Sequence, residues 1–200
     1  MKSFYLDFVM NKEEGKAFQF IEELEEYEAS FNIETEEGVL TPVFDNPIGT
    51  IYVDSTGGEN RIASVLYDFL KPRKNNYRFV ITGDCSSNAI LLLLALNPKQ
   101  LIINRQAVGT IHLSSYNHSV REIAFTNKTD LHIADYHGFV NYLDVLLDCY
   151  KVFLTKEEFN RTKTGLDVYL NSERIQEVFK KLKTSRAFQE KCKNIFELTL

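Results

Sequence analysis

The sequence of 200 residues is poor in the features that define several large protein classes. Its three cysteines are widely spaced and form no CxxC pair, which argues against a disulfide framework and against the common zinc pattern. No apolar run approaches the roughly 20 residues of a membrane span. The first residues, MKSFYLDFVM, run directly into the charged segment NKEEGK, so we expect no signal peptide. These absences predict a cytoplasmic protein that does not enter a membrane.

An excess of basic charge is also missing. The formal net charge is −5 at pH 7, which makes nucleic acid and anionic membranes poor partners. Histidines at 118, 132 and 137 have no paired spacing of the kind that zinc ligands show. We therefore predict no nucleic-acid partner, no metal and no cofactor.

Strand and helix patterns alternate along the chain, without repeats or a low-complexity linker. Short apolar runs predict strands at 4–10, 49–58, 77–82, 100–104 and 107–114. Helical spacing predicts helices at 13–28, 61–71 and 88–96, and a mostly helical chain from 137 onward. This order predicts one α/β domain over residues 1–200, with repeated β-α-β units and a largely parallel sheet.

Two of the predicted strands end in small residues that could build a site. One end is Ser55-Thr56-Gly57-Gly58 and the other runs from Gly83 to Ser87. Paired glycines let a backbone N–H approach a ligand, and free N–H groups at a helix start favour negative charge. The two ends together could form an oxyanion hole that faces a nucleophile. Taken singly, each is more often an ordinary turn or helix cap.

The spacing of three motifs resembles one known family. IYVDSTGG is similar to a strand followed by S-P-G-G, ITGDCSSNA to the nucleophile turn G-x-A-x-S-x-A, and AVGTIHLSS to a strand that ends in a catalytic histidine. In this order, without a gap, they resemble the Clp protease proteolytic subunit, a serine peptidase family whose fold is shared with the crotonases. The resemblance covers about 45–180 and implies a ClpP/crotonase-like fold.

The resemblance also implies roles for five residues. Ser87 would be the nucleophile, His112 the general base and Asp167 the third member of the triad, matched through GLDVYLNSERIQEVF. The N–H groups of Gly58 and Asn88 would form the oxyanion hole. The expected activity is a serine endopeptidase that hydrolyses peptide bonds of a peptide or unfolded protein substrate.

Other residues could serve as the acid of the triad or as the nucleophile. Asp135, Asp144 and Asp148 could replace Asp167, although the last two fit a solvated helix face and the first a helix cap. Cys85 could be a reactive thiol, but its position favours a small buried residue.

Assembly is a further implication of the resemblance. The region of about 115–160 matches the protruding handle helix by which such subunits stack, and its apolar stripe includes Leu146 and Tyr150. We expect a homo-oligomer, either a ring or two stacked rings, and a possible AAA+ unfoldase partner. Residues near 30–47 have no counterpart in the family and predict an insertion. The glycine-rich turn expected after the histidine is replaced by SSYNHSVRE.

Two other classes of function remain open from the sequence. A crotonase-type acyl-CoA enzyme would use the same paired N–H groups to stabilise a thioester enolate, but it needs neither the serine nor the histidine at this spacing. A non-catalytic structural or adaptor relative would keep the fold for assembly alone, against which the three triad candidates argue.

Overall fold

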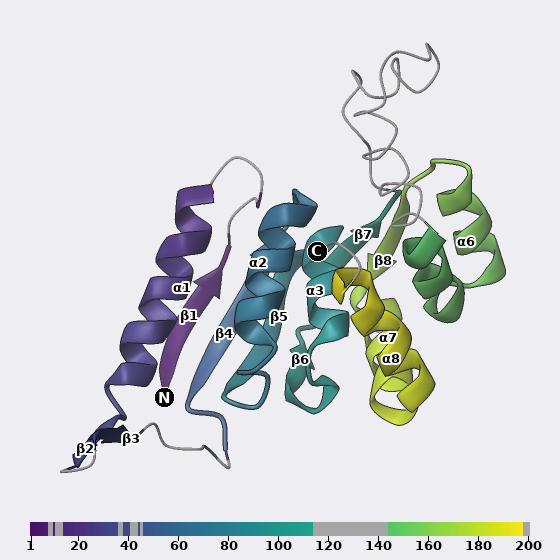
Figure 1. Cartoon of the computed structure of the whole chain (residues 1–200). Coiled ribbons are helices and arrows are strands. Elements are labelled where there is room, and N and C mark those ends of the chain that lie inside the picture. Colours follow the sequence, from purple (N-terminus) through teal and green to yellow (C-terminus); the bar gives the residue numbers. More distant parts are fainter. Residues whose placement is uncertain are drawn as a thin grey trace, which may run out of the picture.

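The computed structural model describes residues 1–7, 10, 14–35, 38–40, 44, 46–113 and 144–197. Its centre is a six-stranded sheet in the order β1-β4-β5-β7-β8, with β6 paired to β5 (Figure 1). Within this sheet four strand pairs are parallel and one, β7 with β8, is antiparallel. The predicted α/β class with a mostly parallel sheet is therefore confirmed.

The elements have the following bounds. The strands of the sheet are β1 (Lys2–Leu6), β4 (Gly49–Ser55), β5 (Tyr77–Cys85), β6 (Leu101–Ile103), β7 (Val108–Ile111) and β8 (Val168–Asn171). The helices are α1 (Glu14–Ala29), α2 (Asn60–Leu70), α3 (Asn88–Ala95), the 3-10 turn η1 (Pro98–Gln100), α6 (Lys156–Lys163), α7 (Ser172–Thr184) and α8 (Arg186–Glu197), and residues 144–153 are also helical.

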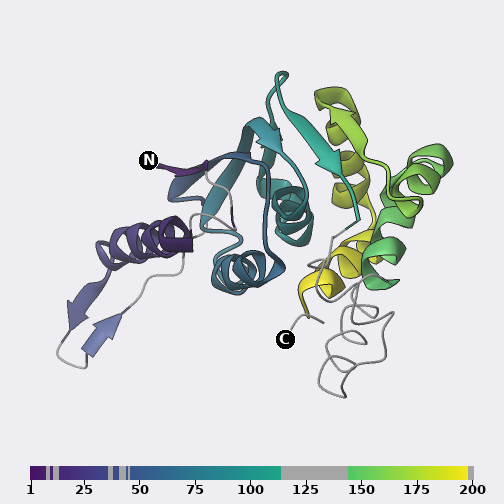
Figure 2. The same ribbon diagram turned by 90° about the horizontal axis from the view of Figure 1, so that it is seen from above.

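Helices α1, α2 and α3 lie along one face of the sheet, as the view from above shows (Figure 2). Helix α2 buries Ile62, Leu66 and Leu70, which recur at a spacing of four and so share one side of the helix. Every residue of α3 is buried, which explains its continuous apolar run. These helices and the sheet contribute to one hydrophobic core, which also includes side chains from α7 and α8.

The opposite face of the sheet carries a row of apolar side chains. Tyr5, Tyr52, Val80 and Ile102 stand in register on four neighbouring parallel strands. The rings of Tyr5 and Tyr52 stack with their centroids 5.4 Å apart. Tyr5 is 59% exposed and Ile102 45%, and no described helix covers this face (Figure 2). Parallel sheets usually have both faces covered, so this exposed row is unusual.

Strand β5 continues three residues beyond its predicted end. It pairs Ile81 with Val53, but the next pair joins Cys85 to Ser55, so β5 bulges between the two. Asp54 fills the space beside the bulge, and a Cβ on Gly83 would lie 2.5 Å from its carboxylate oxygen. The bulge displaces the turn toward α3 and places Ser86 and Ser87 beyond the strand.

The described chain from 144 onward is mostly helical, as predicted, but the prediction missed the strand β8. Val168 and Leu170 are buried, while Tyr169 and Asn171 are exposed, which is the alternation of a strand. The segment is too short to show this period clearly between two helical patterns. Its pairing partner, β7, lies about 60 residues earlier in the chain.

The predicted insertion near 30–47 contains a small hairpin of β2 (Ile33–Thr35) and β3 (Gly38–Leu40). Most of the predicted handle region of about 115–160 lies outside the described residues, which resume at 144. From there, helix 144–153 packs onto the domain itself, because Leu146 and Tyr150 are buried in its core. Those two side chains are therefore not part of an exposed stripe.

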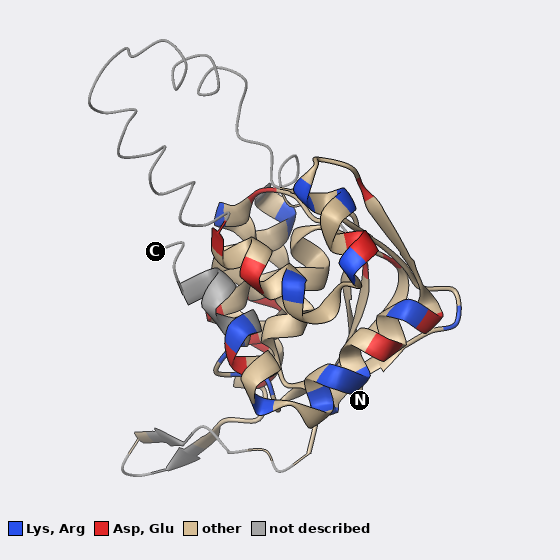
Figure 3. Cartoon of the chain, turned by 90° about the vertical axis from the view of Figure 1, so that its right-hand side faces the viewer, with Lys and Arg blue, Asp and Glu red and all other residues tan. Residues whose placement is uncertain are grey.

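The described helices show no membrane-spanning segment, since none combines the necessary length and apolar character. On the side of the molecule that carries α6, α7 and α8, basic and acidic residues alternate (Figure 3). This mixture is typical of a solvated surface.

Candidate functional site

The turn between β5 and α3 holds Ser87 in an unusual backbone conformation. Its φ is 51° and its ψ is −128°, and among the described residues no other non-glycine residue has a positive φ. Such a conformation costs about 1–3 kcal/mol and persists only where the surroundings enforce it. Ser87 is the N-cap residue of α3, yet its hydroxyl caps no N–H group of the helix. Ser87 therefore occupies the N-cap position, but its side chain does not form the hydrogen bond of an ordinary helix cap.

Hydrogen bonds to β7 hold the turn in place. The N–H of Ser87 donates to the carbonyl of Thr110 at 2.8 Å, and the N–H of Thr110 donates to Oγ of Ser86 at 2.8 Å. The N–H of Ser86 also donates to the carbonyl of Ser55 at 3.0 Å. The two serines are thus tied to the strands on both sides, which enforces the strained backbone.

The glycine turn after β4 lies directly against Ser87. Gly57 has a φ of 87°, and a Cβ there would lie 2.9 Å from Cβ of Ser87 and 2.8 Å from the nitrogen of Asn88. The Asn88 side chain donates from Nδ2 to the carbonyl of Gly58 at 2.5 Å and to Oδ1 of Asn60 at 2.7 Å. The structure therefore brings Gly58 and Asn88 together beside the serine. Among the hydrogen bonds of the described residues, none is donated by the backbone N–H of Gly58 or of Asn88.

A pocket of about 210 Å³ opens beside this turn. It is lined by Thr56, Asp84, Ser86, Thr110, His112 and Asp167. Two of the three predicted triad members therefore border one pocket, and the third, Ser87, follows a lining residue in the chain.

The pairing of β7 with β8 explains why His112 and Asp167 meet. Ile111 pairs with Val168, so one further step of the same antiparallel register places His112 opposite Asp167. Directly opposed residues on two strands have Cβ atoms about 4.5–5.5 Å apart. The hydroxyl of Tyr150 donates to the carbonyl of His112 at 3.0 Å and anchors the end of β7 to helix 144–153.

No hydrogen bond joins the side chains of Ser87, His112 and Asp167 among those of the described residues. Catalytic hydrogen bonds are often long before a substrate binds, so the separation does not oppose a triad. Asp144 and Asp148 are exposed on helix 144–153, as a solvated face predicts. Asp135 lies outside the described residues, as do His118, His132 and His137.

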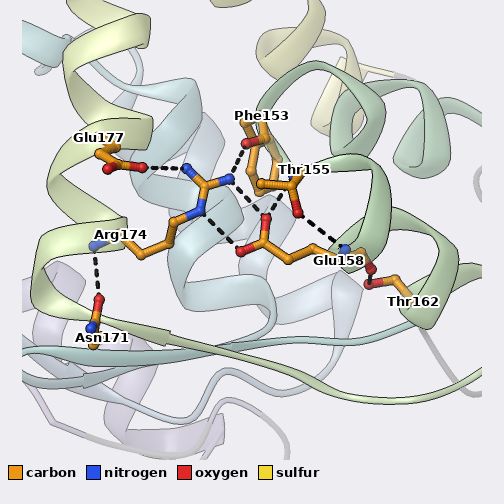
Figure 4. Close-up of polar contacts among 7 residues, drawn as sticks. All are labelled: Phe153, Thr155, Glu158, Thr162, Asn171, Arg174 and Glu177. Carbon is orange, nitrogen blue, oxygen red and sulfur yellow. Dashed lines mark hydrogen bonds and ion pairs between the residues drawn. The ribbon is translucent and has the colours of Figure 1, made fainter.

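A network around Arg174 holds the segment that carries Asp167 (Figure 4). Helix α6 begins with a capping box of Thr155 and Glu158. Arg174 of α7 donates to Glu158 at 2.8 Å, to Glu177 at 2.9 Å and to the carbonyl of Phe153 at 2.7 Å. Because β8 lies between α6 and α7 in the chain, this network fixes both ends of the segment that leads to the pocket.

Cys85 lies beneath the turn and is fully buried. Burial, followed by the charges of Asp84 and Asp54, raises the pKa of its thiol far above the ordinary range. A thiol in this state is a poor nucleophile, which fits a small core residue. Within the described part of the chain, no group of three His, Cys, Asp or Glu residues could hold a metal ion.

Sequence reasoning missed several residues of the site. It named Gly57 as part of the glycine turn but assigned a role only to Gly58, although a Cβ on Gly57 would lie 2.9 Å from Cβ of Ser87. It also missed Asp84 and Thr110, which line the pocket. Only the alternation of neighbouring strands could have indicated them. Asp84 of β5 and Thr110 of β7 stand at even-numbered positions, as do Ser86 and His112 directly after these strands.

Comparison with known proteins adds no relative to this picture. No protein-family model matches the sequence, and no curated protein matches it. The site is therefore interpreted from its own geometry and from the resemblance of its motifs.

Proposed function

We propose that the protein is a serine endopeptidase with a ClpP/crotonase-like fold, in which Ser87 attacks the peptide carbonyl. The observation that carries the proposal is the strained backbone of Ser87 at a strand-to-helix turn, without a capping role for its hydroxyl. A sharp turn of this kind exposes a nucleophile and directs it away from the helix that follows.

The neighbouring groups support the remaining roles. His112 accepts the proton of Ser87 and later delivers it to the leaving amine, while Asp167 orients the imidazole. The N–H groups of Gly58 and Asn88 stabilise the oxyanion that forms on the carbonyl. Asp144, Asp148 and Asp167 are all exposed, but only Asp167 stands opposite His112 in the antiparallel register of β7 and β8, which favours it as the third residue.

The alternatives explain the serine less well. Glycine would adopt the backbone of residue 87 without strain, so a protein with no chemistry at this position gains nothing from a serine there. A crotonase-type acyl-CoA enzyme would need the paired N–H groups of Gly58 and Asn88, but not the hydroxyl beside them. A non-catalytic structural or adaptor protein would need neither.

The proposal includes assembly into a homo-oligomeric ring or stacked rings that enclose the sites, with a possible AAA+ unfoldase partner. The row of Tyr5, Tyr52, Val80 and Ile102 on the open face of the sheet supports the assembly. A second copy of the chain that covers this row would give the parallel sheet its missing layer.

Labelling with a fluorophosphonate probe, followed by mapping of the modified residue, tests the nucleophile. We expect an adduct at Ser87 that disappears in Ser87→Ala. Ser86→Ala should still be labelled at Ser87, though more slowly, because the turn loses its bond to Thr110. Ser3→Ala, on the exposed end of β1, serves as the control. A folded protein that acquires no adduct, while a known serine peptidase does, would contradict the proposal.

A further inference from the structure

Asp84 is an acidic residue of the pocket that the proposed hydrolysis does not use. It lies on β5 where this strand pairs with β7, opposite Val108. The Asp84 carboxylate accepts a hydrogen bond from the hydroxyl of Ser86, which is itself bonded by the N–H of Thr110. No hydrogen bond joins Asp84 to His112 among those of the described residues.

The Asp84 side chain is held in place on one side and open on the other. Its backbone N–H donates to Oδ1 of Asp54 at 2.7 Å, and the hydroxyl of Ser86 donates to its own Oδ1. Its second oxygen, Oδ2, accepts no hydrogen bond from the residues that the structure describes. The carboxylate is therefore fixed, half-buried and able to bind a donor that enters the pocket.

The described residues of the pocket offer this carboxylate no permanently charged cationic partner. Among the described residues that line it there is neither lysine nor arginine. A metal ion would need more ligands, and no group of three metal-binding side chains occurs in the described ranges. A single fixed carboxylate in a pocket instead fits the ammonium or guanidinium group of a long side chain, which binds through charge-assisted hydrogen bonds.

We infer that Asp84 binds a lysine or arginine side chain of the substrate and gives the peptidase a preference for basic residues next to the scissile bond. This inference rests on the proposed function, since it assigns a substrate class to the same site. The aliphatic stem of such a side chain would pass Ser86 and Thr110 while its charged end reaches Asp84. An acidic side chain would meet the charges of Asp84 and Asp167 and bind poorly.

Paired fluorogenic peptides that differ only in charge test the preference. Arginine is compared with citrulline, and lysine with norleucine, at the positions next to the scissile bond. We expect kcat/KM to be about ten- to a hundredfold higher for the charged member of each pair, the range of a charge-assisted hydrogen bond in a partly buried site. In Asp84→Asn this ratio should fall to about one, because the amide keeps the bond to Ser86 but loses the charge. Asp68→Asn, exposed on α2, should keep the wild-type ratio.

The possible results separate this inference from the proposed function. Equal cleavage of both members of each pair by a wild-type protein that labels at Ser87 would overturn the preference alone. A ratio that survives in folded Asp84→Asn would overturn the role of Asp84. Absence of the Ser87 adduct would instead overturn the proposed function.

If Asp84→Asn does not fold, Asp84→Glu keeps the charge but extends the side chain by one methylene. Its ratio of arginine to lysine cleavage must then differ from the wild-type ratio, and an unchanged ratio would contradict the inference.

Discussion

At the scale of single residues, the site depends on small side chains that lie close together. A Cβ on Gly57 would lie 2.6 Å from the carbonyl oxygen of Ser86, and one on Gly109 would lie 2.8 Å from that of Cys85. Both glycines allow neighbouring backbones to approach so closely that Ser87 is held against the glycine turn and β7. The strained serine and its glycine neighbours therefore form one structural unit.

The proposed acid of the triad, Asp167, gives a prediction at this scale. Asp167→Asn should lower kcat for peptide hydrolysis by about 10⁴-fold, as replacement of the triad aspartate does in serine proteases. The physical reason is that an asparagine opposite His112 stabilises neither the required tautomer nor the imidazolium. Steady-state kinetics with a short peptide measures the effect.

Asp148→Asn is the control for that measurement, because Asp148 is exposed on helix 144–153. It should retain nearly the full rate. Near-normal hydrolysis by folded Asp167→Asn would show that Ser87 and His112 act as a pair or use another acid.

At the scale of elements, the short strand β8 depends on the helices beside it. It contributes four residues to the edge of the sheet, yet it carries the residue next to Asp167. The capping box of α6 and the Arg174 network hold the chain in place before and after β8. The position of Asp167 is thus set by contacts among α6, α7 and helix 144–153 as well as by strand pairing.

The Arg174 network predicts a pH dependence of stability. Hydrogen bonds from Arg174 are the main cause that lowers the pKa of Glu158 below its ordinary value. A carboxyl group whose pKa is lower in the folded state contributes stability above its unfolded pKa, about 4.3, and loses it as the pH falls through the folded value. Glu158→Gln should therefore lower the free energy of unfolding by about 1–2 kcal/mol at pH 7, a range that allows for its partial exposure.

Urea unfolding of both proteins between pH 7 and pH 3 measures this difference, which should shrink steadily below pH 4.5. Glu177→Gln is the matched control, because Glu177 bonds the same arginine but its side chain is 66% exposed. Its effect should stay below about 0.5 kcal/mol. A Glu158→Gln difference that is independent of pH would contradict the assignment to the ion pair.

At the scale of the whole molecule, the helices are unevenly distributed over the sheet. Helices α1, α2 and α3 cover one face (Figure 2). The aligned apolar row lies on the other face. Asp84 and Thr110 of the pocket extend from this second face by the alternation of β5 and β7, and Ser86 follows β5 directly. Assembly through the open face would therefore place neighbouring copies close to the sites.

Light scattering at micromolar concentration tests the assembly. We expect a mass of several subunits for the wild-type protein. Tyr52→Glu should shift the mass toward the monomer, because it places a charge in the centre of the apolar row. Phe18→Glu, at a 45% exposed position of α1, should leave the mass unchanged. A wild-type monomer would contradict assembly and with it the enclosed chamber.

The sequence by itself determined the elements with clear periods. The strands around Ile51 and Phe79 and helix α2 were predicted correctly, because apolar spacing of two or four residues reflects which side of an element is buried. Helix α3 was predicted from its continuous apolar run. The motifs also singled out Ser87, His112 and Asp167 as candidates, of which the structure brings the last two to one pocket. Local spacing is sufficient for these features.

Only the tertiary structure decided which distant residues meet. The strain of Ser87 arises from bonds to Thr110 and from contact with Gly57, which lie 23 and 30 residues away in the chain. The position of Asp167 depends on the register of β8, a strand of four residues too short for its period to be recognised. Asp84 became a candidate specificity residue only when the bulge in β5 placed it in the pocket. Contacts between segments far apart in the chain depend on strand register and packing, and no local pattern encodes either of them.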